Sequence, residues 1–136
     1  MNWSDMREIK LRYTFKRLSD GFIKQVWVKL EYFESRVGEI YNWINHEDWG
    51  CIGKDLYTSL KDKNGKEIYE GDIVSFDIQD YNGIDHFYKS EVYYWGSCFS
   101  CDTDKSCIIN LDNALADDED IEIIGNIYEN PELIKE

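Results

Sequence analysis

The chain of 136 residues lacks several features on which common functions depend. It has one proline, two histidines and no run of the roughly 18 apolar residues that a membrane-spanning helix needs. It also lacks a glycine-rich phosphate loop, a serine nucleophile elbow and a histidine-rich metal motif. No signal peptide precedes Met6. These absences predict a non-enzymatic cytoplasmic protein with no cofactor and no membrane segment.

The four cysteines do not make a complete zinc motif. Cys98 and Cys101 have the spacing of a zinc knuckle, and Cys107 follows them. A fourth ligand would have to come from a distant part of the chain: Cys51, His46 or His86. We therefore expect reduced thiols and no metal, because an intracellular setting keeps cysteines reduced. A reactive or redox pair is the remaining alternative.

Negative charge is concentrated in the second half of the chain. Residues 1–60 hold nine basic and nine acidic residues, whereas residues 61–136 hold six basic and nineteen acidic residues, a net charge of −13. A half of that sign repels phosphate backbones, which argues against non-specific nucleic-acid binding. Solubility is the ordinary explanation. Binding of a basic partner surface and imitation of DNA are the functional ones.

The first half shows the period-two pattern of strands. Apolar residues alternate with polar ones over residues 9–16, which predicts a strand with one buried face, and again over residues 22–33. Ser19-Asp20-Gly21 supplies a turn, so the two strands should pair as a hairpin. Residues 38–44 are interpreted as a third strand, with a short helix as the competing interpretation.

The second half contains about five short strands separated by tight turns. Asn64-Gly65 predicts a two-residue type I′ hairpin with positive φ at both residues. A second break at residues 70–72 leads into a strand over residues 73–78, and further strands are expected at 87–95, 108–111 and 121–128. A terminal helical turn should begin at Pro131 with Asn130 as its N-cap.

These patterns predict a mostly β fold. We expect an N-terminal β-hairpin lobe, residues 6–56, packed on a small antiparallel barrel of the SH3-like or OB-like type, residues 57–136, with a short C-terminal helical turn. The whole chain, residues 1–136, would form a single domain. Both Met1 and Met6 stay open as the native start.

One basic cluster stands out in the acidic half. Lysines and aromatic residues surround the Asn-Gly turn, and such mixtures can seat nucleic acid. The tentative interaction residues are Lys61, Lys63, Asn64, Lys66 and Tyr69. The competing interpretation is a solvated turn, with Tyr69 in the core. Asp72 is interpreted as a turn residue that accepts backbone N–H bonds, and no catalytic residue is predicted.

Three segments carry a resemblance to a known family. The opening residues 6–12, the central residues 57–74 and the closing residues 123–134 resemble the motifs of the YopX family of phage and prophage proteins, with Ser59 where that family more usually has glycine. The resemblance implies a mostly β fold, a phage origin and no assigned biochemical activity. Its motifs contain no cysteine, which is a further argument against zinc.

Together these features predict a phage accessory protein of the host cytoplasm. We expect it to engage a protein partner through its acidic C-terminal half, and a homo-oligomer is plausible because exposed strand edges invite pairing. The alternative is a small nucleic-acid-binding barrel that uses the Lys61–Lys66 turn.

Overall fold

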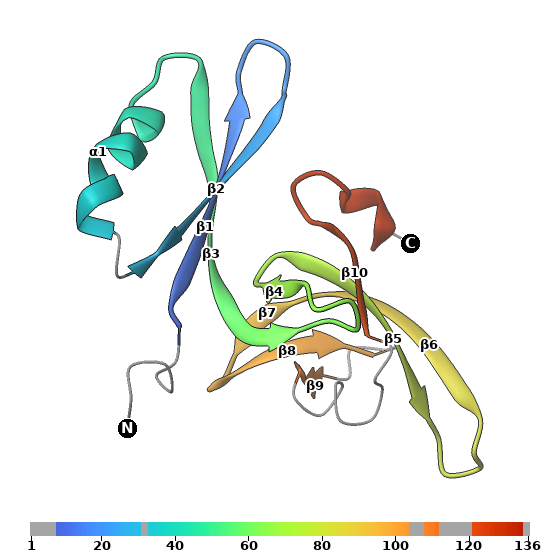
Figure 1. Ribbon diagram of the computed structural model, residues 1–136. Helices are drawn as coiled ribbons and strands as arrows, with labels where there is room; N and C mark the ends of the chain where they lie inside the picture. Colours follow the sequence, from blue (N-terminus) through green and yellow to red (C-terminus); the bar gives the residue numbers. More distant parts are fainter. Residues whose placement is uncertain (1–7, 31–32, 104–107, 112–120, 135–136) are drawn as a thin grey trace, which may run out of the picture. The chain divides into compact units, whose positions relative to one another are not determined.

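The computed structural model describes residues 8–30, 33–103, 108–111 and 121–134. Its elements are, in order, β1 (Lys10–Arg17), β2 (Ile23–Lys29), α1 (Phe33–Ile44), β3 (Trp49–Lys61), β4 (Glu67–Tyr69), β5 (Asp72–Gln79), β6 (Asp85–Glu91), β7 (Tyr93–Trp95), β8 (Cys98–Asp102), β9 (Ile108–Asn110), β10 (Glu122–Asn126) and a 3₁₀ turn (Pro131–Leu133) (Figure 1). The predicted mostly β, antiparallel class is confirmed. No helix among the described residues has the length and apolar character needed to cross a bilayer.

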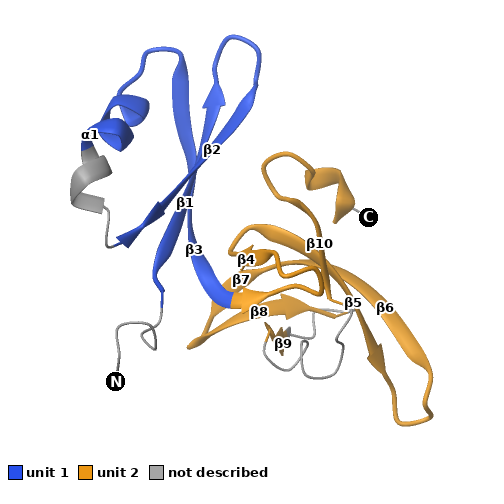
Figure 2. Cartoon of the chain, viewed as in Figure 1, with its two compact units in different colours: residues 1–59 blue, residues 60–136 orange. Residues whose placement is uncertain are grey.

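The chain divides into two compact units, residues 1–59 and 60–136 (Figure 2). In the first unit β1 pairs antiparallel with β2, with Tyr13 opposite Val26, which confirms the predicted hairpin. On its other side β1 pairs with β3, with Leu11 opposite Leu56. Strand β1 is therefore an inner strand of the sheet, with β2 on one side and β3 on the other.

The core of the first unit forms on one face of this sheet. Its members are Tyr13, Phe15, Val26 and Val28 from the strands and Ile40 from α1. Trp43 extends this core, because its ring lies 5.5 Å from that of Phe15 and 5.0 Å from that of Trp49. The alternation that predicted β1 and β2 thus identified the strand residues that helix α1 covers.

The third strand predicted over residues 38–44 is wrong, because these residues belong to helix α1. Tyr41 and Trp43 favour strands by propensity, and Gly38 weakens a helix. The apolar spacing of Phe33, Val37, Ile40 and Ile44 nevertheless follows the helical period. Burial of Ile40 against the sheet outweighs these local preferences, since tertiary packing supplies most helical stability.

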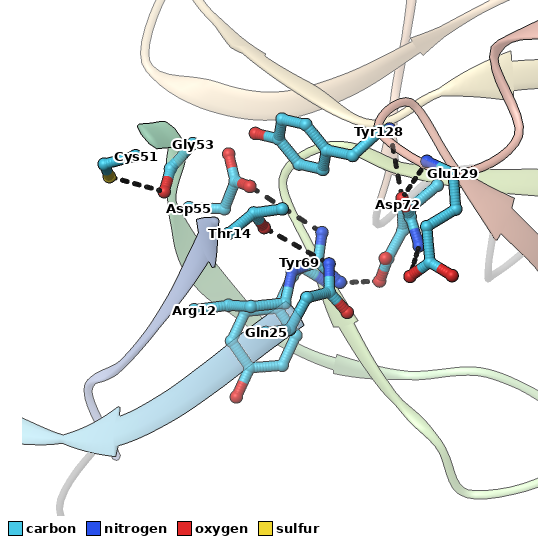
Figure 3. Close-up of polar contacts among 11 residues, drawn as sticks. Arg12, Thr14, Gln25, Cys51, Gly53, Asp55, Tyr69, Asp72, Tyr128 and Glu129 are labelled. Atoms are coloured by element: carbon cyan, nitrogen blue, oxygen red, sulfur yellow. Dashed lines mark hydrogen bonds and ion pairs between the residues drawn. The ribbon is translucent and has the colours of Figure 1, made fainter. Parts of the chain in front are cut away.

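Strand β1 also departs from the expectation of a single buried face. Arg12 and Thr14, which alternate with the core residues, are 4% and 0% exposed. The Arg12 guanidinium lies 3.7 Å from the Asp55 carboxylate of β3, and the Gln25 amide donates to the Thr14 hydroxyl at 3.2 Å (Figure 3). Pairing and hydrogen bonding allow these polar groups to be buried, which an alternation pattern cannot reveal.

In the second unit, β10, β5 and β6 form one three-stranded sheet and β7, β8 and β9 form another. The predicted SH3-like or OB-like barrel is not found as a closed barrel among the described residues. Most of the buried apolar residues described in this unit form one cluster, with members in β4, β5 and β8 and others directly beside β6, β9 and β10: Ile68, Val74, Phe76, Val92, Cys101, Leu111 and Ile121. The strands of these two sheets therefore share one core although the described strands do not form one closed sheet.

The predicted terminal turn is present at Pro131–Leu133, with the proline at its start. Asn130 is not a side-chain cap, however, because its side chain makes no capping hydrogen bond. Its Oδ1 instead accepts the backbone N–H of Asn126 at 3.3 Å. An asparagine before a proline can serve either role, so the sequence alone could not separate them.

Candidate interaction surface

The turn at residues 62–66 is built by one carboxylate. Asp62 Oδ1 accepts the backbone N–H groups of Asn64 and Lys66, both at 2.9 Å. The Gly65 N–H donates to the Asp62 carbonyl at 3.0 Å, and the Asp62 N–H donates to the Lys66 carbonyl at 2.8 Å. This pattern is a type I turn followed by a left-handed glycine, a common three-residue hairpin loop.

The predicted hairpin and the positive φ of Gly65, 79°, are therefore confirmed. The predicted type I′ turn is wrong, because Ser59 is the one non-glycine residue with positive φ in the described part of the chain. Asp62 explains the difference, since its side chain stabilises the N–H of Asn64 in a right-handed Asx turn. The signal was available in the sequence, two residues before Asn64.

This turn is tied to strand β10. Asp62 Oδ2 accepts the backbone N–H of Ile123 at 3.1 Å, and the Lys63 N–H donates to the Ile121 carbonyl at 2.9 Å. The Lys63 ammonium also lies 3.3 Å from the Glu122 carboxylate. The central segment that resembles the YopX motif is thus fastened to the closing one by backbone and side-chain contacts.

A second tie between the same segments lies at Gly71 and Asp72. The buried Asp72 carboxylate accepts the backbone N–H of Tyr69 at 2.8 Å, which confirms its predicted role in the turn. The Gly71 carbonyl accepts the N–H of Ile127 at 2.9 Å, and the Gly71 N–H donates to Val92. Figure 3 shows Asp72 beside the segment that carries Tyr128 and Glu129.

The structure gathers most of the tentative interaction residues on one hairpin. Lys61, Lys63, Asn64 and Lys66 are exposed at or beside the 62–66 turn. Tyr69 is not part of this surface, because it is 3% exposed. The ion pair with Glu122 offsets the charge of Lys63, so the basic character of the hairpin is weaker than the sequence indicates.

The cysteines lie in different environments. Cys101 is fully buried in the core of the second unit, and burial raises its thiol pKa to about 12. Cys51 is exposed, Cys98 is half-buried, and Cys107 lies outside the described residues. Across the parts of the chain that the structure describes, no group of three or more His, Cys, Asp or Glu side chains could hold a metal ion.

The two histidines also have local partners. His86 Nε2 lies 2.8 Å from Asp80 Oδ2, and this contact is the main cause that lowers the pKa of Asp80. The His46 Nδ1 accepts the backbone N–H of Asp48 at 3.1 Å. Both histidines are exposed. His46 lies in the loop between α1 and β3, whereas His86 lies in strand β6, opposite Ile78 of β5.

A second copy of the same turn lies at residues 80–84, within the loop that the second Asn-Gly pair of the sequence predicts. Asp80 Oδ1 accepts the N–H groups of Asn82 and Ile84, both at 2.9 Å, and the Gly83 N–H donates to the Asp80 carbonyl at 3.0 Å. The Asp-x-Asn-Gly pattern shared with residues 62–65 was the available signal. This turn joins β5 to β6 and presents Tyr81 and Ile84 to solvent.

The chain is similar to a known protein family. The profile of the family described as YopX protein matches residues 55–135, more than half of the chain, and the chain therefore belongs to the YopX family. No curated protein sequence matches it.

Among solved structures, the chain is similar to the crystal structure of protein EF1440 from Enterococcus faecalis. The two are 24% identical over 99% of this chain and 84% of that one, with a TM-score of 0.46.

Proposed function

We propose that this YopX-family protein is a non-enzymatic phage accessory protein that binds a basic surface of a protein partner in the host cytoplasm. The observation that carries the proposal is the charge distribution. Residues 61–136 have a net charge of −13, whereas residues 1–60 are neutral. A surface of that sign attracts cationic partners over a distance and repels nucleic acid.

The roles of the carboxylates in the second unit support this proposal. Asp62 and Asp72 are buried, and their carboxylates accept backbone N–H groups and hold turns. Asp85, Asp102 and Glu129 are among the exposed carboxylates of this unit. The sequence adds a continuous acidic run at residues 117–120. When the half-buried carboxylates are counted with the exposed ones, the accessible charge in the described part of this unit is chiefly negative.

The alternative nucleic-acid function rests on Lys61, Lys63 and Lys66. With Lys63 paired to Glu122 and Tyr69 buried, the hairpin offers neither a full basic strip nor an exposed stacking ring of its own. Any binding through it should be weak and should fall steeply between about 50 and 200 mM salt, because phosphate contacts release counterions.

A mobility-shift assay with single- and double-stranded DNA and RNA at low salt tests the proposal. We expect no binding of free nucleic acid. Sub-micromolar binding that disappears when Lys61→Ala is combined with Lys63→Ala would contradict the proposal and establish the alternative.

A capture experiment from host lysate then tests the acidic surface itself. Conversion of the four acidic residues at 117–120 to their amides should abolish recovery of a specific partner, and added DNA should compete with the wild-type protein for that partner. The matched control converts Glu8, Asp20, Glu39 and Glu47 of the first unit to amides and should leave recovery unchanged. Equal recovery with both variants would exclude the acidic run at residues 117–120 as the binding surface.

A further inference from the structure

Strand β6 is an edge of the sheet ordered β10-β5-β6. Within the described part of the chain, no strand pairs with its outer side. Figure 1 shows β6 running beside β5 toward the turn that joins them. Phe87, the third residue of β6, is 63% exposed. An open edge with an exposed aromatic residue is a template for another strand.

The register of the hairpin shows which backbone groups face outward. The Asp80 N–H donates to the Ile84 carbonyl at 2.9 Å, and the Val92 N–H donates to the Asp72 carbonyl at 2.8 Å. Bonded and non-bonded pairs alternate in an antiparallel ladder, and β5 and β6 keep one register between these two bonds. The even-numbered residues of β6 therefore bond to β5. Asp85, Phe87 and Lys89 are odd-numbered and therefore direct their N–H and C=O groups to the open edge.

The charges along this edge are self-complementary. We propose that β6 pairs antiparallel with β6 of a second copy of this chain, about a two-fold axis at Phe87. In this register Phe87 faces its own counterpart, and Asp85 of each copy faces Lys89 of the other. Opposite charges and aromatic residues are both favourable cross-strand neighbours. The outward N–H and C=O groups of all three residues would find partners in the other copy.

Several other registers are less favourable. An axis at Asp85 or at Lys89 would place two like charges directly opposite each other, and an axis at Tyr88 would place Asp85 opposite Glu91. An axis between two residues would place each odd-numbered residue opposite an even-numbered residue of the other copy. The N–H and C=O groups of the even-numbered residues already bond to β5, so the outward groups would find no partners. The axis at Phe87 satisfies both the backbone and the charges.

Two chains of net charge −13 also repel each other, which makes the pairing weak. The mass should therefore be measured by sedimentation equilibrium at protein concentrations from about 10 μM to about 1 mM. We expect the mass to rise from 16.2 kDa toward twice that value. A constant mass of 16.2 kDa over the whole range would overturn the proposal.

Charge exchange tests the register. Asp85→Lys alone and Lys89→Asp alone each convert two attractive cross-strand pairs into repulsive ones, and each should weaken dimerisation at least about tenfold. An equimolar mixture of the two variants should dimerise again, because each copy then opposes a charge of the other sign. Failure of the mixture to recover, with both single variants folded, would overturn the pairing of residues 85 and 89.

Proline substitution tests the backbone bonds. Lys89→Pro removes an N–H that faces the open edge, whereas Tyr88→Pro removes one that bonds to β5. Lys89→Pro should abolish the dimer with little change in the melting temperature of the monomer. Tyr88→Pro should lower that melting temperature markedly. A dimer that survives Lys89→Pro would show that the two copies meet through another surface.

Discussion

The carboxylate of Asp62 accepts the backbone N–H of Ile123 at 3.1 Å, although 61 residues separate them. The same carboxylate holds the 62–66 turn, so one side chain fixes a local loop and a distant strand together. Both residues lie in segments that resemble the YopX motifs. In this protein, therefore, the central and the closing motif contact each other directly.

Removal of that carboxylate should destabilise the protein strongly. We expect Asp62→Ala to lower the free energy of unfolding by about 2–3 kcal/mol, because it leaves several backbone N–H groups without their acceptor, including that of Ile123. The measurement is urea denaturation followed by tryptophan fluorescence.

Asp80→Ala is the matched control for this prediction. It removes the same carboxylate from the same type of turn, but at an exposed position whose other contact is His86. We expect a cost of about 1 kcal/mol or less. Equal costs at the two positions would show that the contact with Ile123 contributes little.

Gly65 should resist substitution because of its φ of 79° rather than for lack of space. A Cβ there would meet no heavy atom within 4 Å, so the cost of Gly65→Val is backbone strain of about 1 kcal/mol or more. Gly38 in helix α1 is the control. It is equally open but has no positive φ, and Gly38→Ala should stabilise by about 0.5–1 kcal/mol. Thermal denaturation of both variants checks the opposite signs.

Ser59 has a φ of 70°, a conformation that favours glycine. We expect stability at this position to follow the order Gly, Ser, Val, with Val about 2 kcal/mol below Gly. Ser75 in β5 is the control, where the extended backbone should reverse the order and favour Val over Gly. The same order at both positions in urea titrations would exclude backbone strain at Ser59.

Alkaline pH should reveal the buried thiol of Cys101. Its pKa is raised from about 9 in the unfolded chain to about 12 by burial, so its contribution to stability is complete below pH 9 and is lost as pH rises toward 12. Tyr93, with a pKa raised from 10 to about 12, adds a loss of the same sign. We expect the stability of Cys101→Ala to decline less steeply above pH 9 than that of the wild type.

Thiol alkylation at pH 8 gives an independent measurement. Cys51 is exposed and should react in the folded protein, whereas Cys101 should react after unfolding. Rapid modification of Cys101 in the folded state, detected by peptide mass spectrometry, would contradict its position in the core.

Much of the local structure followed from the sequence. Alternation predicted β1 and β2 and the core residues Tyr13 and Val26, because a strand presents successive side chains to opposite faces. The Asn-Gly pair predicted the 62–66 hairpin, although Asp62 changed the type of its turn. The hairpin lysines are exposed, since charged side chains stay in water unless they are paired.

Other features could not be read from one sequence. Residues 38–44 include residues that favour strands and residues that favour helices. Their packing against the sheet stabilises the helix. The alternating pattern of β1 places Arg12 on the face expected to be exposed to solvent. In the structure its side chain is buried and forms an ion pair with Asp55. Tyr69 was grouped with the lysines around its turn, and the buried position of its ring removes it from their surface.

The sequence by itself determined the β-rich class, the main turns and the concentration of negative charge in the second half, because these depend on residue type and spacing over a few residues. The tertiary structure decided which distant segments meet, as in the contact of Asp62 with Ile123, and which edge stays open, as in β6. These features depend on hydrogen bonds and packing between residues that are far apart in the chain, and a local sequence pattern does not contain that information.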